Sequence, residues 1–112
     1  MLYKMKIIFC PYLDRNVILT DERYDHIKKQ HPELLPEFEY TLEHTIANPD
    51  TVRKSSRFIN ARLFTKYFDN IRNGKYIVVV IVNDAHLETR DWIITAYMTR
   101  KLSDGVVEWE KK

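Results

Sequence analysis

Two histidines on one short segment are the first candidates for chemistry in this sequence. His26 and His31 lie within residues 21–31, which the sequence predicts to be helical. An imidazole gains and loses a proton near neutral pH, so either residue suits general acid or general base catalysis. The two lie about 140° apart around a regular helix and do not converge on one metal ion. We therefore expect acid–base chemistry without a metal.

Each histidine also has a purely structural interpretation. His31 shares a helix face with Tyr24 and Ile27, where it could simply pack or cap the end of the helix. His26 lies on the polar face, where exposure to solvent is the ordinary outcome. The remaining two histidines are expected at the surface: His44 and His86.

Cations and aromatic rings alternate along one predicted strand. Arg62, Phe64, Lys66 and Phe68 occupy every second position, which places all four side chains on one face. Cations stabilise the charge that gathers on phosphoryl oxygens in a transition state, and aromatic rings stack on bases. The two cationic residues have Cα atoms about 13 Å apart, so both can reach one nucleic-acid backbone. Alternatively, both rings belong to the core and the cations extend to the sheet edge.

Charge is distributed unevenly although the net charge is only +2. Residues 33–50 include five acidic residues and no Lys or Arg, whereas residues 53–66 include five basic residues and no Asp or Glu. Such asymmetry attracts an anion to one face, or marks two solvated faces of opposite sign.

Length and composition favour one globular domain over residues 1–112. Cys10 is the one cysteine, so no internal disulfide forms, and this favours a reducing compartment. The apolar run at 7–10 is too short for a signal peptide, and no run approaches membrane-spanning length. With only Gly74 and Gly105 available, there is no nucleotide-binding glycine loop. We expect a cytoplasmic protein that needs no cofactor and has no membrane partner.

Hydrophobic periodicity divides the chain into a hairpin, two helices and a set of strands. Two short apolar runs around a polar break at 14–16 predict a β-hairpin. Thr20 is a good N-cap for a helix that ends near His31, and a second helix is predicted from around 32–36 to Ala47. After it the pattern alternates and predicts strands at 51–53, 62–68, 76–82, 92–99 and 106–109.

The order of these elements indicates the fold class. Helices precede strands rather than alternating with them, which favours an α+β fold over a doubly wound one. We expect an N-terminal short β-hairpin, two helices, and then a twisted antiparallel sheet of about four strands. The helices should cover one face of this sheet and leave the other partly open.

A set of short motifs runs from about Leu19 to Lys101. In chain order they are Leu19-Thr20, His26-Ile27, His31-Pro32, Asn48-Pro49-Asp50, Arg62, Lys66 and Ile94-Thr95-Ala96-Tyr97. Together they resemble the barnase–EndoU–colicin–RelE superfamily of small nucleases, especially members attached to phage and toxin proteins. The resemblance implies a metal-independent endoribonuclease. In such an enzyme a ribose 2′-hydroxyl attacks its own phosphodiester and leaves a cyclic phosphate.

The resemblance also implies a set of active residues. The family pattern carries over to a helix histidine, a basic residue on a strand and a Thr or Tyr on a late strand: His31 or His26, Arg62 or Lys66, and Thr95 or Tyr97. The implied substrate is RNA, and the implied setting is a free-standing toxin or phage-derived effector with a protein regulator or antitoxin. Two further functions are open on the same fold: a non-catalytic protein-interaction module, and an RNA-binding domain that leaves RNA intact. The oligomeric state is open as well.

Overall fold

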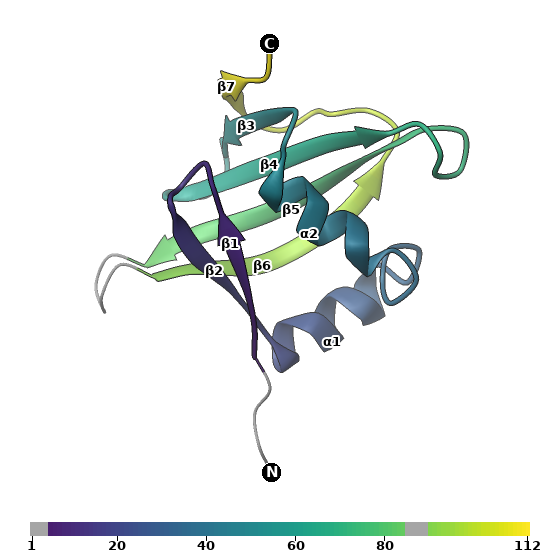
Figure 1. Cartoon of the computed structure of the whole chain (residues 1–112), viewed down its shortest axis with the longest axis horizontal. Helices are drawn as coiled ribbons and strands as arrows, with labels where there is room; N and C mark the ends of the chain where they lie inside the picture. The colour runs from purple at the N-terminus through teal and green to yellow at the C-terminus, as the bar shows by residue number, and fades with distance from the viewer. Residues whose placement is uncertain (1–4, 85–89) are drawn as a thin grey trace.

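The computed structural model describes residues 5–84 and 90–112. Its elements are β1 (Met5–Cys10), β2 (Arg15–Thr20), α1 (Asp21–Gln30), α2 (Glu39–Ala47), β3 (Thr51–Lys54), β4 (Ala61–Phe68), β5 (Lys75–Asp84), β6 (Arg90–Thr99) and β7 (Val106–Glu110). The seven strands in these two ranges form one sheet in the order β1-β2-β6-β5-β4-β3-β7 (Figure 1). Within the same ranges, no helix has the length and apolar character needed to cross a membrane.

The sheet corrects the predicted fold. An antiparallel sheet of about four strands, with a separate hairpin, is wrong, because the sheet is mixed and has seven strands. The hairpin joins it through a short parallel pairing of β2 with β6, in which Val17 lies opposite Asp91 and Ile18 opposite Trp92. At the other side β7 pairs with β3. Both pairings join segments far apart in the chain, so local periodicity does not indicate them, yet they satisfy strand backbone groups that would otherwise lie unpaired.

The first helix follows the predicted capping pattern, and the second does not begin where predicted. The Thr20 side chain accepts a hydrogen bond from the backbone N–H of Arg23 at 3.2 Å, which confirms the N-cap. The second helix begins only at Glu39, and residues 32–38 form turns instead. Pro36 explains the delay, because a proline disfavours helical geometry at the residue before it.

One face of the sheet is covered by both helices, and we call it the helix-covered face. Ile27 of α1 and Ile46 of α2 are fully buried there. They belong to the same cluster as Phe64 and Phe68 of β4, whose side chains are 0% and 8% exposed. The core interpretation of these two rings is therefore confirmed, and they offer no surface for stacking bases.

The opposite face, which we call the open face, has a smaller apolar cluster. Its sheet residues include Leu63 and Val80, and Leu102 packs on them from the segment at 100–105. This segment, the crossover, connects β6 with β7 at the far side of the sheet and so passes over the strands between them. Gly105 has φ +82°, and a Cβ there would lie 2.6 Å from the backbone oxygen of Lys54. The crossover therefore lies directly on the sheet and covers part of the open face.

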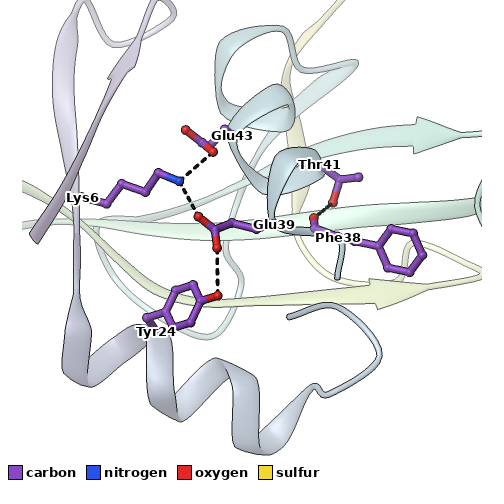
Figure 2. A network of polar contacts seen from close by, with 6 residues as sticks. All are labelled: Lys6, Tyr24, Phe38, Glu39, Thr41 and Glu43. Atoms are coloured by element: carbon purple, nitrogen blue, oxygen red, sulfur yellow. Dashed lines mark hydrogen bonds and ion pairs between the residues drawn. The ribbon is translucent and has the colours of Figure 1, made fainter. Parts of the chain in front are cut away.

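A polar network ties the hairpin to both helices on the helix-covered side (Figure 2). The Lys6 ammonium pairs with the carboxylates of Glu39 and Glu43, and the Tyr24 hydroxyl donates to Glu39 at 2.8 Å. The hydrogen bond from Lys6 holds the pKa of Glu39 below its usual range. Two residues of the acidic run at 33–50 thus act as internal ties rather than as free surface charge.

Candidate active site

The two candidates on the late strand lie on the open face. Thr95 and Tyr97 of β6 are opposite Val80 and Val78 of β5, whereas Ala96 between them is buried in the helix-covered core. Both hydroxyl-bearing side chains line a hollow of about 260 Å³. The floor of the hollow is apolar because it is formed by the small core cluster of this face.

The walls of this hollow come from two loops. The loop that joins β3 and β4, residues 55–60, and the crossover contribute its polar rim: Ser55, Arg57, Phe58, Ser103 and Asp104. The hydroxyl of Ser56 donates to the Asp104 carboxylate at 2.7 Å and ties the two walls together. The Ser55 hydroxyl accepts from the backbone N–H groups of Arg57 and Phe58, each at 3.1 Å, and shapes the loop. The walls are therefore held by defined contacts.

Charged groups surround the Tyr97 hydroxyl. Burial raises its pKa, Asp104 raises the pKa further, and the guanidinium groups of Arg57 and Arg53 oppose that rise. Tyr97 is therefore protonated at neutral pH and able to donate a hydrogen bond or a proton. The two cations and one carboxylate that act on Tyr97 sum to a positive charge, which suits an anionic ligand beside it. Of these three residues, Arg57 and Asp104 line the hollow and Arg53 does not.

Arg53 has a structural role in addition to its charge. It lies opposite Leu63 in the β3–β4 pairing, and its Nη1 donates to the backbone oxygen of Asp104 at 3.1 Å. This contact holds the crossover against the sheet. Its Nε is buried without a hydrogen-bond partner among the described residues. Arg57, in contrast, is exposed in its loop and has its guanidinium close enough to affect Tyr97.

His31 reaches the same site from the helix layer. It caps the C-terminus of α1, which lies beside β6 (Figure 1), and its backbone N–H donates to Ile27 at 2.7 Å. The half-buried imidazole packs on Tyr97 with ring centroids 5.9 Å apart. Its Nδ1 lies 3.3 Å from a carboxylate oxygen of Glu33. His31 thus packs on a residue that lines the hollow, while it does not line the hollow itself.

The two predicted strand cations lie on the other face. Arg62 and Lys66 share the helix-covered face with the buried aromatic residues of β4. Arg62 pairs with Glu108 of β7 at 2.9 Å, and Lys66 lies 3.5 Å from the carboxylate of Asp50. Asp50 also accepts from the backbone N–H of Tyr67 at 2.8 Å and anchors the start of β3 to β4. The structure therefore does not bring these two cations to Tyr97.

Neither His26 nor His44 lines the hollow. His26 is exposed on α1, so of the two helix histidines it is His31 that approaches Tyr97. His44 is exposed as predicted, with its ring 5.8 Å from that of Phe68. His86 lies outside the described residues. Within the described part of the chain, no group of three or more His, Cys, Asp or Glu side chains is arranged to hold a metal ion.

Sequence reasoning missed three residues of this site: Arg53, Arg57 and Asp104. Arg53 follows the buried Val52 in a strand too short for its faces to be assigned, and Arg57 is in a loop without periodicity. Asp104 precedes Gly105, and such an Asp-Gly pair indicates only a turn. The one available signal was the run of basic residues at 53–66, which the structure divides between the two faces.

The fold and the site together define a class: an α+β protein with a mixed seven-stranded sheet, two helices on one face and a hollow with a polar rim on the other. Comparison of the chain with protein-family models, curated proteins and solved structures gives no match.

Proposed function

We propose that this protein is a metal-independent endoribonuclease whose active site is the hollow on the open face. The observation that supports this best is the surroundings of Tyr97: two guanidinium groups, a carboxylate and the ring of His31 beside one hollow. A site of this kind has proton donors and acceptors next to fixed positive charge, which phosphodiester transesterification requires. The single cysteine, Cys10, is buried and unpaired, which suits a cytoplasmic protein.

The reaction needs two proton transfers, and one residue carries out each of them. If Nδ1–H of His31 donates to Glu33, the Nε2 lone pair is free to accept the proton of a ribose 2′-hydroxyl. The resulting oxygen nucleophile attacks phosphorus, and the bond to the 5′-oxygen of the next nucleotide breaks. Tyr97 carries its phenol proton at neutral pH, as a tyrosine ordinarily does and as burial here reinforces, and it donates this proton to the leaving oxygen. The products are a 2′,3′-cyclic phosphate and a free 5′-hydroxyl, and proton return from His31 to Tyr97 restores the enzyme.

The remaining groups stabilise the charge on phosphorus. Arg57 is exposed at the rim and can bind two phosphoryl oxygens with parallel hydrogen bonds. The Thr95 hydroxyl lines the same hollow and can donate a further hydrogen bond. Arg53 adds positive charge while it holds the crossover in place. We assign the cationic role to these two arginines because they lie on the same face as Tyr97.

The test is a cleavage assay on labelled single-stranded RNA with EDTA present. Wild-type protein should cleave and leave a 2′,3′-cyclic phosphate end, while the same strand without 2′-hydroxyls should stay intact. His31→Ala should lose roughly 10²- to 10⁴-fold in rate, as loss of a general base does. His26→Ala is the matched control, an exposed histidine on the same helix, and should cleave like wild type. Activity that disappears with EDTA, or equal activity of His31→Ala, would contradict this mechanism.

An RNA-binding module without cleavage is the second candidate. The observation that favours it is Asp104, whose carboxylate lies in the same hollow as Tyr97 and repels a phosphate there. Such a module would bind RNA with an affinity that falls steeply with salt, and would leave the RNA intact in every variant. The same gel, read beside a binding assay, separates the two candidates.

A further inference from the structure

A second hollow lies on the other side of the β3–β4 loop. It has a volume of about 610 Å³ and shares Ser55 and Phe58 with the hollow that contains Tyr97. Lys54, Asn60 and Arg62 are among its other lining residues. The shared residues mean that the two hollows are neighbours, separated by the loop that carries Phe58.

Phe58 is a large apolar residue, yet its surroundings do not account for the exposure of its ring. Its side chain is 58% exposed, and it makes no ring–ring contact with another aromatic residue in the described ranges. Its ring belongs to neither of the two core clusters. The loop is nevertheless shaped by the bond from the Phe58 backbone N–H to Ser55 at 3.1 Å. The backbone that carries the ring is thus held by a defined contact, and the ring lines both hollows.

Cations lie on both sides of this ring. Arg57 lines the first hollow, and Lys54 lines the second. Lys54 is exposed at the end of β3 and forms no ion pair among the described residues. The other cations of the second hollow already have acidic partners: Arg15 pairs with Asp91, and Arg62 pairs with Glu108. Within the described ranges, an exposed aromatic ring with an unpaired cation in each neighbouring hollow combines the two features that bind single-stranded nucleic acid, a stacking surface and phosphate contacts.

We propose that Phe58 is a stacking platform for an unpaired RNA base next to the cleaved linkage, and that Lys54 binds the adjoining phosphate in the second hollow. The inference rests on the proposed function, since it takes the first hollow as the place of cleavage. A base can lie on the exposed ring only if it is unstacked from its neighbours and unpaired. The substrate class is therefore single-stranded RNA that crosses the β3–β4 loop, and duplex RNA is a poor ligand.

Binding is measured first with a short 2′-O-methyl RNA strand, which cannot undergo the proposed transesterification. Phe58→Ala should weaken binding about tenfold, as loss of one stacking aromatic residue does, and Phe58→Trp should retain it. Phe9→Ala is the matched control, because Phe9 is 53% exposed on β1 and lines neither hollow. Lys54→Ala should lower the slope of log affinity against log salt by about 0.7, as loss of one phosphate contact from a single strand does.

A set of strands with one abasic nucleotide each then tests the stacking itself. At one position the missing base should weaken wild-type binding about as much as Phe58→Ala does, and the two changes together should weaken it no further. Equal binding by wild type and Phe58→Ala, or equal binding of duplex and single strand, would overturn the stacking site. If binding depends on Phe58 while unmodified RNA stays intact, the result supports the stacking site. It then contradicts only the proposed ribonuclease activity.

Discussion

Arg57 and Arg62 are close in sequence but have different surroundings. Arg62 lies on the helix-covered face, where its Nε is 2.9 Å from the carboxylate of Glu108. Arg57 is exposed at the rim of the hollow on the open face, where its guanidinium affects Tyr97. A surface ion pair contributes little stability but occupies its cation. Whether a cation can bind a ligand thus depends on whether an acidic residue already pairs with it. Of these two arginines, Arg62 is paired with Glu108, and Arg57 is the one free to bind a phosphate.

Two phenylalanines, one in the β3–β4 loop and one in β4, show a similar contrast. Phe64 of β4 is 0% exposed and packs in the large core, whereas Phe58 is 58% exposed between the two hollows. Burial of a phenylalanine is the ordinary outcome, since the transfer of its ring from water is favourable. The ring that escapes burial is therefore the better candidate for function. The helix-covered face holds the large core, and the open face carries the hollow lined by Tyr97.

The largest expected effect tests this division through stability. Phe64→Ala should lower the free energy of unfolding by about 3–5 kcal/mol, because it leaves a cavity in the core. Phe58→Ala should change it by no more than about 0.5 kcal/mol, as exposed substitutions do. Urea denaturation of both variants measures the difference. A similar loss in the two variants would show that Phe58 supports the fold, and would remove the contrast between the rings.

The next effect tests the division through catalysis. Arg57→Ala should reduce the rate of RNA cleavage about 10²-fold, the scale of losing one donor to transition-state charge. Arg62→Ala should stay within a few-fold of wild type at saturating RNA, because its cation lines the second hollow rather than the cleavage site and is already paired with Glu108. Single-turnover cleavage by both variants gives the ratio. The reverse order of effects would return the phosphate-binding role to Arg62, as the family resemblance implies.

The smallest effect concerns the network of Lys6, Tyr24 and Glu39. The hydrogen bond from Lys6 lowers the pKa of Glu39, so the stability that it contributes is present above the unfolded pKa and is lost as pH falls through the folded one. Glu39→Gln should therefore lower stability at neutral pH by less than about 1 kcal/mol and reduce the loss of stability in acid.

Urea midpoints at neutral and acidic pH measure this effect. RNA cleavage at neutral pH should not change, because the network lies on the helix-covered side, away from the hollow. Cleavage that falls while the midpoint stays constant would mean that the two sides are coupled.

Local patterns in the sequence predicted the elements well and the sheet poorly. The cap at Thr20 and the apolar strand at 76–82 follow from neighbouring residues alone, and both are confirmed. The parallel pairing of Ile18 with Trp92 joins distant segments and has no local signal. The second helix was predicted from apolar spacing to begin around residues 32–36, yet it begins only at Glu39, after Pro36.

For the site, residue spacing predicted which side chains share a strand face but not which face is open. Alternation correctly placed Phe64 with Arg62 on one face of β4, and Thr95 with Tyr97 on one face of β6. Which of those faces is the open one could not be predicted, because a period of two residues is the same for both sides of a strand. The structure therefore brings His31 to Tyr97 and leaves Arg62 on the opposite side.

The sequence by itself determined the order of hairpin, helices and strands, the cap of α1 and the pairs of residues that share a strand face. Only the tertiary structure decided the open face, because that depends on where α1 and α2 pack and on how the crossover passes over the sheet. It also decided which cations are available, because an ion pair such as Arg62 with Glu108 joins β4 to β7 across the fold. Backbone preferences act over a few residues, whereas packing and charge pairing act between segments that meet only in the folded chain.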